Sequence, residues 1–347
     1  MKALLILMNN KNIIITGAAG FIGFHVSLRL KKEGYQIIAI DNLNKSYDVK
    51  IKKERLKILL KEGNHSLKFY EQDIVNKNCL RELFLKYKPS VVINLAAQAG
   101  VRNSIINPDI FIKSNILGFY NIIECCREFK VENFIYASSS SVYGNNKKIP
   151  FSEEDFVDHP VSLYAATKKS NELMAHTYSE LFKIPSTGLR FFTVYGPWGR
   201  PDMAPIIFAK NIFSKKPIKV FNHGNLWRDF TYIDDIVETI SRLIKKPATI
   251  DQLSRSNNSS KLINSCPHKV FNVGNGQETK LIDFISTLER IIGIKAIKDL
   301  QPMQLGDVHM TLADTSSIKD WIGFVPKTDL TFGLEKFVLW FKDFYIN

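Results

Sequence analysis

A glycine-rich turn between an apolar strand and a helix is the feature that most constrains the fold of this chain. The stretch "NIIITG" (12–17) reads as a buried strand, and "FIGFHVSLRLKKEG" (21–34) reads as a helix that ends at a glycine. Gly17 ends the first stretch, Gly20 lies between the two stretches, and Gly23 is the third residue of the second. Their spacing is G-x-x-G-x-x-G. Glycine allows a tight turn and a close approach of the backbone to a pyrophosphate. Because a helix N-terminus offers unpaired N–H groups to an anion, the turn predicts dinucleotide binding.

Four further apolar runs in the first 140 residues alternate with amphipathic stretches. We expect strands at 36–42, 67–74, 89–97 and 132–140, with a helix around 115–128 before the last of them. Strands that alternate with helices predict a parallel, doubly wound sheet, and strands this apolar fit burial on both faces. The expected fold class is therefore α/β.

The character of the sequence changes near residue 195, where the elements become shorter and glycine, proline and aromatic residues become more frequent. We predict three parts. A short N-terminal extension (1–11) precedes a dinucleotide-binding domain (12–195) that also carries the catalytic residues. A smaller α/β subdomain (196–347) is expected to bind the substrate, with some of its segments returning to the first domain.

Composition argues against a nucleic-acid partner. The chain has 347 residues, of which 45% are hydrophobic, and this suffices for a large core. Its net charge of +13 invites a nucleic-acid interpretation, but the lysines are scattered along the chain. The nearest approach to a basic run, "KIKKERLK" (50–57), is interrupted by Glu54 and by apolar residues, so we interpret it as a solvated helix face. A general positive field would favour an anionic small substrate.

Cysteine usage and hydropathy predict a cytoplasmic protein. The 4 cysteines lack metal-ligand spacing and fit reduced, packed thiols. The apolar run at the start is too short for a signal peptide, and no stretch approaches the length of a membrane span, so we expect no membrane association. No spacing of His, Asp and Glu suggests a metal site, and none is expected.

Two acidic residues mark the predicted cofactor edge. Asp41 ends the second predicted strand, where its carboxylate can accept hydrogen bonds from both ribose hydroxyls of adenosine. It would repel a 2′-phosphate, which favours NAD over NADP, although Asp41 could also be a simple turn former. Asp73 is a weaker candidate for contact with the adenine edge, with Ile74 as the alternative.

The stretch "SLYAATKKS" places Tyr164 and Lys168 four residues apart in a region without Gly or Pro. In a helix these residues share a face. Free tyrosine titrates near pH ~10, so it is a poor base at neutrality. A neighbouring ammonium and a positively charged nicotinamide ring would stabilise the phenolate and lower its pKa. The pair alone is a common accident, but here it accompanies the glycine turn and a serine cluster, "SSSSVYG" (138–144).

With these motifs in order, the sequence resembles the extended short-chain dehydrogenase/reductase family over nearly the whole chain. "NLAAQAGVR" (94–102), "LRFFTVYGPWGRPDMA" (189–204) and "WRDFTYIDD" (227–235) are similar to nucleotide-sugar epimerases, and "GPWGRPDMA" to UDP-glucuronate 4-epimerases in particular. The resemblance implies a Rossmann-type domain with bound NAD. It implies reversible C4 epimerisation of UDP-glucuronate to UDP-galacturonate through a transient 4-keto intermediate. A UDP-glucose or UDP-N-acetylglucosamine 4-epimerase is the alternative.

The resemblance also implies roles for single residues. Tyr164 would be the base and acid at the sugar 4-hydroxyl, Lys168 would hold the nicotinamide ribose and tune Tyr164, and Ser139 and Ser141 would share the sugar hydroxyl. The implied cofactor-binding residues are Gly17, Gly20, Phe21, Ile22, Gly23, Asp41, Asn42, Asp73, Ile74, Leu95, Ala96, Ala97, Gln98, Asn115, Tyr164 and Lys168.

The implied substrate contacts come mainly from the second half of the chain. Thr193 stands where many UDP-hexose epimerases carry Asn, and we interpret this difference as part of a pocket for a carboxylate. Arg200 is the preferred partner of the C6 carboxylate or of a nearby phosphate. Arg228 would hold the diphosphate and Asp307 the uridine ribose. The full set of substrate candidates is Arg102, Thr193, Arg200, Met203, Phe221, Arg228 and Asp307, with Arg102 equally compatible with a surface charge.

Neighbouring reactions and a non-catalytic role fit the sequence less well. A 4,6-dehydratase usually carries an Asp-Glu pair beside the catalytic hydroxyl, and the related decarboxylases carry Glu at the position of Ser141, where this chain has serines. An NAD-sensing regulator that lost catalysis would usually lack Tyr164 or Lys168. The family suggests a homodimer formed through helices near 115–128 and 165–182, and a role in polysaccharide biosynthesis.

Overall fold

A seven-stranded parallel sheet forms the centre of the computed structural model, which describes residues 11–61, 66–250, 266–304 and 306–346. The strand order is β10-β6-β5-β4-β1-β2-β3, and every neighbouring pair is parallel. The sheet changes direction of winding beside β1, as in a doubly wound fold. The strands are β1 (Asn12–Thr16), β2 (Gln36–Asp41), β3 (Leu67–Glu71), β4 (Val91–Asn94), β5 (Asn133–Ser139), β6 (Ser186–Phe191) and β10 (His268–Val273).

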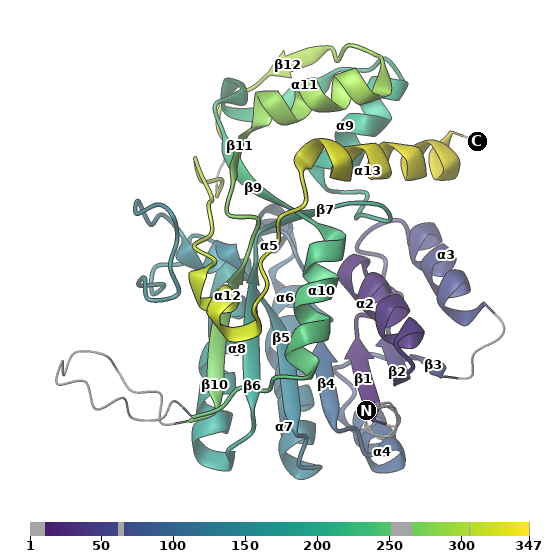
Figure 1. Ribbon diagram of the computed structural model, residues 1–347, viewed down its shortest axis with the longest axis vertical. Helices are drawn as coiled ribbons and strands as arrows, with labels where there is room; N and C mark the ends of the chain where they lie inside the picture. The colour runs from purple at the N-terminus through teal and green to yellow at the C-terminus, as the bar shows by residue number, and fades with distance from the viewer. Residues whose placement is uncertain (1–10, 62–65, 251–265, 305, 347) are drawn as a thin grey trace.

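Helices cover both faces of this sheet, which explains why its strands are apolar throughout. Ile13 and Ile15 of β1 pack into the core on one face, and Ile14 packs into the core on the other. Figure 1 shows α2 and α10 in front of the sheet. The helices are α2 (Phe21–Lys32), α3 (Val49–Leu60), α4 (Lys77–Tyr87), α7 (Phe119–Glu128), α8 (Leu163–Phe182) and α10 (Ile233–Ile244).

Two of the expected strands are shorter than their apolar runs. The run 67–74 forms a strand only to Glu71, and the run 89–97 forms one only from Val91 to Asn94. Residues 72–74 and 95–97 of these runs form loops at the carboxyl ends of the two strands. The helix expected around 115–128 is also divided, because a π-helix (η1, Ile112–Gly118) precedes α7.

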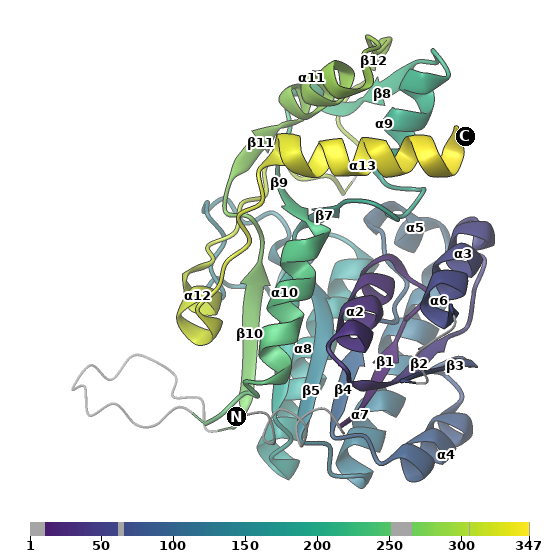
Figure 2. The ribbon, with the colours of Figure 1, turned by 45° about the vertical axis from the view of Figure 1, so that its right-hand side comes forward.

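A smaller group of strands and helices lies beyond the carboxyl ends of the large sheet (Figures 1 and 2). It contains a three-stranded sheet in the order β11-β9-β7 and a two-stranded pair of β12 and β8. Its strands are β7 (Thr193–Tyr195), β8 (Ile218–Val220), β9 (Trp227–Tyr232), β11 (Glu278–Lys280) and β12 (Lys298–Leu300), and its helices are α9 (Ala204–Phe213), α11 (Leu281–Ile292) and α13 (Leu330–Tyr345).

The predicted α/β fold class, with a Rossmann-type sheet, is confirmed. Segments from beyond residue 196 join the large sheet, because β10 pairs with β6 and α10 packs on α2. The short elements α5 (Val101–Ile106), α6 (Pro108–Phe111), η2 (Ser140–Tyr143), η3 (Phe221–Gly224) and α12 (Ser316–Ile322) complete the described chain. Of the expected extension 1–11, all but residue 11 lies outside the described residues. Among the helices that the structure describes, none combines the length and apolarity needed to cross a membrane.

Candidate active site

The glycine turn forms a cradle with no room for side chains. Gly17 has a φ of +69°, and a Cβ atom there would lie 2.7 Å from the backbone nitrogen of Ala96. A Cβ on Gly20 would lie 2.9 Å from the carbonyl oxygen of Gly17, and one on Gly23 would overlap the same atom. Helix α2 begins after Gly20, and among the described residues no side chain caps it. The turn therefore leaves backbone N–H groups available to an anion.

Asp41 supports the cradle from the end of β2. One carboxylate oxygen accepts a hydrogen bond from the N–H of Ala19 at 3.0 Å, and the other accepts one from the N–H of Leu43 at 2.8 Å. The side chain thus joins the glycine turn to the loop after β2. Its charge lies at the edge of the sheet where the predicted ribose would bind.

The other predicted cofactor residues converge along the carboxyl ends of the strands. Asn42 donates to Asp73 at 2.7 Å. Gln98 donates its backbone N–H to Asn115 at 2.8 Å, and Asn115 donates back to the carbonyl oxygen of Gln98 at 3.0 Å. Asn115 also reaches Thr167 of α8 at 3.0 Å. The glycine cradle, the uncapped helix and the Asp41 carboxylate together fit a dinucleotide such as NAD.

Helix α8 carries Tyr164 and Lys168, which with Ser139 and Ser141 form the group that we call the proton relay. Ser162 caps the helix by accepting from the N–H of Ala165 at 3.1 Å, which places Tyr164 in the first turn. Lys168 lies one turn later, and its ammonium donates to the carbonyl oxygen of Ala137 in β5 at 2.9 Å. Its Nζ atom lies 6.0 Å from the centroid of the Tyr164 ring.

The serine cluster meets this helix at the end of β5. The hydroxyl of Ser141 donates to the hydroxyl of Ser139 at 3.0 Å, and the N–H of Ser141 also donates to it at 3.2 Å. Ser139 in turn hydrogen-bonds to Tyr164. The structure therefore brings together the four residues to which the sequence analysis gave catalytic roles. They are Tyr164, Lys168, Ser139 and Ser141.

Burial shifts the pKa values of both residues on α8. We predicted that a neighbouring ammonium and a positively charged nicotinamide ring together lower the pKa of Tyr164. In the protein alone, burial raises the pKa of Tyr164, and the hydrogen bond from Ser139 and the charge of Arg200 only oppose that rise. Burial also lowers the pKa of Lys168 to about 8, opposed by the charge of Glu172.

A buried ion pair behind the relay was not predicted from the sequence. Glu172 and Arg190 form a bidentate pair, with distances of 2.9 Å and 2.8 Å between the guanidinium nitrogens and the carboxylate oxygens. Ser138 donates to Glu172 at 2.6 Å, and Arg190 donates to the hydroxyl of Tyr143 at 2.9 Å. The spacing of Tyr164, Lys168 and Glu172, four residues apart each time, is the signal that could have identified the carboxylate.

The predicted nucleotide contacts form a second group. Arg102 of α5 pairs with Asp307 at 3.0 Å and lies over the ring of Phe221, with its guanidinium carbon 4.9 Å from the ring centroid. Arg228 of β9 donates to the carbonyl oxygens of Trp227 and His309. Burial lowers the pKa of Arg228, and the charge of Asp307 opposes this effect. Four substrate candidates thus lie together, and they come from both halves of the chain.

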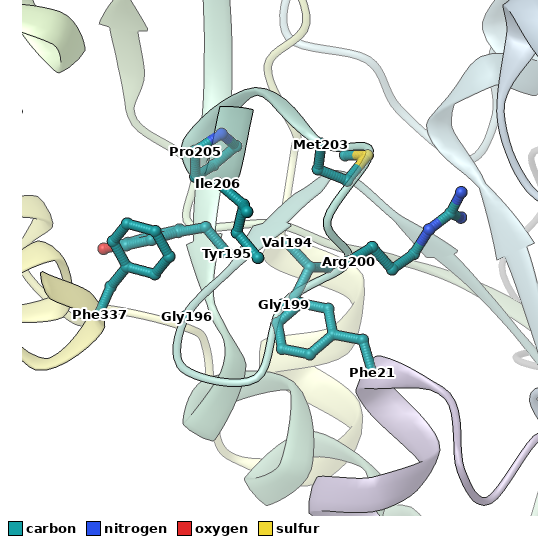
Figure 3. Close-up of a pocket in the computed structure, with 10 residues that line it drawn as sticks. All are labelled: Phe21, Val194, Tyr195, Gly196, Gly199, Arg200, Met203, Pro205, Ile206 and Phe337. Carbon is teal, nitrogen blue, oxygen red and sulfur yellow. The ribbon is translucent and has the colours of Figure 1, made fainter. Parts of the chain in front are cut away.

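Arg200 lies between the cofactor edge and the relay. Its Nε and Nη2 atoms donate to the two carboxylate oxygens of Asp202 at 3.1 Å and 2.5 Å, and Nη2 also donates to the carbonyl oxygen of Ala99 at 3.2 Å. Its charge opposes the rise in the pKa of Tyr164 that burial causes. Figure 3 shows the Arg200 side chain extending away from Ile206 and Phe337, and Met203 lies on the same wall.

The loop that carries Arg200 rests on the C-terminal helix. Trp198 has a φ of +59°, and its ring centroid lies 5.4 Å from that of Trp340 and 4.9 Å from that of Phe344, both in α13. Trp198 is therefore a packing residue that holds this loop against α13. Thr193 lies nearby on β7, paired with Phe230 of β9.

The basic stretch 50–57 is not a uniformly solvated helix face, and that interpretation is wrong for two of its cations. Arg55 is fully buried and donates to the carbonyl oxygens of Ala19, Trp198 and Gly199. Lys52 is 4% exposed and lies 3.9 Å from Asp41. These partners are distant in sequence, so the local charge pattern did not reveal them.

Among the described residues, no group of three or more His, Cys, Asp or Glu side chains could hold a metal ion.

Comparisons with known proteins show the family to which this chain belongs. Residues 13–274 match the family model described as NAD dependent epimerase/dehydratase family. The chain is 50% identical to Protein CapI of Staphylococcus aureus over 333 residues, with 96% of this chain and 99% of that protein covered. It is 42% identical to a probable UDP-glucuronate 4-epimerase of Rhizobium meliloti, with 96% and 97% covered.

Solved structures are similar as well. The crystal structure of UDP-glucuronic acid 4-epimerase from Bacillus cereus, in complex with UDP-glucuronic acid and NAD, matches with a TM-score of 0.84 and 33% identity, covering 96% of this chain and all of that one. The UDP-glucose 4-epimerase of Thermotoga maritima, with UDP-glucose, matches with a TM-score of 0.82 and 30% identity, covering 96% and 99%.

These similarities confirm the predicted resemblance, NAD as the cofactor and the enzyme class, an NAD-dependent UDP-sugar 4-epimerase. The glycine cradle and the Tyr164–Lys168 pair lie inside the matched residues 13–274, so the motifs that predicted the family also fall within the family model. The chain belongs to the NAD dependent epimerase/dehydratase family.

Proposed function

We propose that this chain catalyses the reversible C4 epimerisation of UDP-glucuronate to UDP-galacturonate. The observation that carries the proposal is the position of Arg200, whose guanidinium lies near Tyr164 and already binds one carboxylate, that of Asp202, in a bidentate manner. A planar guanidinium matches a carboxylate better than it matches a neutral hydroxymethyl group. The named relatives from Rhizobium meliloti and Bacillus cereus support the same substrate.

The predicted cofactor-binding residues at the carboxyl ends of β1, β2 and β4, which we call the cofactor edge, would hold NAD by its diphosphate and its adenosine ribose. When bound, NAD supplies a reversible acceptor for the hydride of C4. Gly17, Gly20 and Gly23 leave space for the diphosphate, and Asp41 offers its carboxylate to the ribose hydroxyls. Because the cofactor must be regenerated in every cycle, the site should retain it between turnovers.

Tyr164 acts as base and then as acid at the sugar 4-hydroxyl. Ser139 donates a hydrogen bond to the phenol oxygen and favours the phenolate, and Ser141 orients Ser139. Lys168 supplies positive charge beside the ring. After the 4-hydroxyl has become a ketone, the sugar would turn about its diphosphate linkage and present the other face of C4 to the cofactor site, where the hydride would be returned. Tyr164 then returns the proton to the 4-oxygen.

Arg102, Phe221, Arg228 and Asp307 would hold the nucleotide while the sugar turns. We assign residues 196–347 mainly to this role and residues 12–195 to the cofactor and the relay. Thr193, Arg200 and Met203 would surround the C6 end of the sugar.

A UDP-glucose or UDP-N-acetylglucosamine 4-epimerase is the second candidate. It is favoured by the likeness to the UDP-glucose 4-epimerase of Thermotoga maritima, whose structure contains UDP-glucose. Dehydration and decarboxylation are disfavoured because Ser140 and Ser141 stand where those reactions employ carboxylic acids.

Product analysis tests the proposal. The purified protein is incubated without added NAD in parallel with UDP-glucuronate, UDP-glucose and UDP-N-acetylglucosamine, and the nucleotide sugars are separated. We expect UDP-galacturonate as the main product and little UDP-pentose. Conversion of only the neutral sugars would establish the second candidate, and UDP-pentose as the main product would establish a decarboxylase.

We also propose a homodimer. An exposed apolar face runs over η1, α7 and α8 and the neighbouring α5, where Ile106 is 75% exposed and Leu173 is 56% exposed. Light scattering of the purified protein and of a Leu173→Glu variant tests this, with Leu339→Glu on α13 as an exposed control.

We also propose a cytoplasmic location and a role in polysaccharide biosynthesis. The four cysteines are free thiols, which supports the location, and an acidic UDP-sugar product suits the role.

A further inference from the structure

The buried carboxylate of Glu172 connects the two elements that carry the relay. It projects from α8, one turn beyond Lys168 and two turns beyond Tyr164. One of its oxygens accepts from the hydroxyl of Ser138 at 2.6 Å and from Arg190 at 2.9 Å, and the other accepts from Arg190 at 2.8 Å. Both side chains of the ion pair are 4% exposed.

Ser138 lies between the two residues of β5 that the relay uses. The carbonyl oxygen of Ala137 accepts the hydrogen bond from Lys168, and Ser139 hydrogen-bonds to Tyr164. A carboxylate that fixes Ser138 therefore fixes the backbone on either side of it. A shift of β5 along α8 would lengthen both contacts at once.

Arg190 extends the network away from the helix. Its Nη1 atom donates to the hydroxyl of Tyr143 at 2.9 Å, and that hydroxyl donates to Asn272 of β10 at 2.6 Å. Tyr143 belongs to η2, the turn that begins at Ser140 and contains Ser141. Elements that are distant in sequence, namely β5, β6, α8, β10 and η2, are thus held by one connected set of polar side chains.

Stability alone does not explain this arrangement. Replacing a buried ion pair with apolar residues is often neutral or stabilising, because the loss of hydration offsets the attraction between the charges. Here the pair lies directly behind Lys168, which is itself 3% exposed. Burial lowers the pKa of Lys168, and Glu172 is the charged group that opposes this effect.

Four other ionisable groups lie near Glu172 on α8 and on the neighbouring elements. Arg190 on β6 and Lys169 on α8 lower the pKa of Glu172 and keep it ionised. Tyr136 on β5 and His268 on β10 lie behind it, and burial holds both neutral, by raising the pKa of Tyr136 and lowering that of His268 to about 4. Glu172 is therefore the anion of this group of side chains near neutral pH.

We propose that Glu172 is a positioning residue of the proton relay, which keeps Lys168 an ammonium and holds the Ser139 end of β5 against α8. The inference concerns the relay and applies to whichever UDP-sugar the enzyme accepts. It does not depend on the preference for glucuronate.

The test uses the NAD-containing enzyme and the Glu172→Gln variant, with turnover measured across pH. We expect the alkaline limb of the turnover profile to move to lower pH by about one unit or more, since loss of the anion lowers the pKa of Lys168 further. The KM for the UDP-sugar and the NAD content should stay within about two-fold of wild type. The Glu172→Asp variant, which keeps the charge, should restore the position of the limb.

Two further variants separate this role from a merely structural one. Glu289→Gln removes a carboxylate that is 3% exposed and pairs with lysines far from the relay, so it should leave the limb in place. If Glu172→Gln does not fold, the Glu172→Gln/Arg190→Gln double variant removes both charges and should show the same displaced limb. A uniform loss of turnover with an unmoved limb, in whichever of the two variants folds, would overturn the proposal.

Discussion

Ion pairs support both parts of the proposed active site, but the pair behind the proposed proton relay is buried, whereas the pairs in the proposed substrate pocket are partly open to solvent. Glu172 and Arg190 each expose 4% of their side chains. Around the substrate, Arg102 exposes 53% and Asp202 exposes 45%. Exchanging partners is inexpensive in water and costly in the protein interior. The comparison indicates that the inner charges fix a geometry, while the outer charges can exchange a protein partner for an anionic group of the ligand.

The first prediction tests the fixed part of the site. Tyr164→Phe removes the only atom of that side chain that can move a proton, so turnover should fall about 10³-fold, within the usual range for general acid–base groups. NAD should remain bound, because the cofactor edge is unchanged. Turnover is measured by separation of the UDP-sugars, and NAD is measured after denaturation. Unchanged turnover would remove Tyr164 from its assigned role.

The second prediction concerns the exchangeable part. Arg200→Met should lower kcat/KM for UDP-glucuronate by about 10- to 100-fold, the effect expected when a charge-assisted hydrogen-bonding partner is lost. The same variant should change kcat/KM for UDP-glucose much less, because that sugar offers no carboxylate. Arg81→Met removes a cation from an exposed ion pair on α4 and serves as the control. Equal losses for both sugars would assign Arg200 to the nucleotide rather than to C6.

The third prediction is a pH dependence of the inner region. The pKa of Lys168 is lowered to about 8, so its ammonium is present below that pH and is lost as the pH rises through it. If the relay needs the ammonium, turnover should decline above pH 8 by about tenfold per unit. Rates measured from pH 6 to pH 10, with the fold monitored by circular dichroism, provide the test. A flat profile to pH 10 with the fold retained would show that the charge of Lys168 is dispensable.

The smallest expected effect comes from Asp202. If the substrate carboxylate displaces Asp202 from the Arg200 guanidinium, Asp202→Asn should lower the KM for UDP-glucuronate about two- to five-fold. This factor corresponds to the free energy typical of a partly exposed ion pair. The KM for UDP-glucose should not change. Asp320→Asn, which removes one exposed negative charge on α12, controls for net charge. A higher KM for UDP-glucuronate would instead mean that Asp202 orients Arg200.

The sequence predicted the fold and the inner site well where local rules govern the structure. The glycine spacing, the strand before it and the helix after it reflect steric limits within ten residues of chain. The i, i+4 spacing of Tyr164 and Lys168 follows from helix geometry in the same way. For this reason the cofactor cradle and the pair on α8 appear where they were expected.

The missed residues depend on partners distant in sequence. Arg55 appeared solvated because its neighbours are polar, whereas its hydrogen-bonding partners include Trp198 and Gly199, more than 140 residues away. Arg190 lies in a strand, and the sequence pattern of that strand does not indicate that Glu172 is its ion-pair partner. Burial, which depends on the whole fold, raises the pKa of Tyr164, and no local sequence pattern indicates this effect.

The contact between Trp198 and α13 has a consequence for how the enzyme is made and how it varies. The loop that carries Arg200 is synthesised long before Trp340 and Phe344, the aromatic residues on which Trp198 rests. The sugar pocket can therefore take its final shape only after the ribosome has passed residue 344. Substitutions in α13, far from any ligand in sequence, are expected to alter sugar preference through this aromatic support.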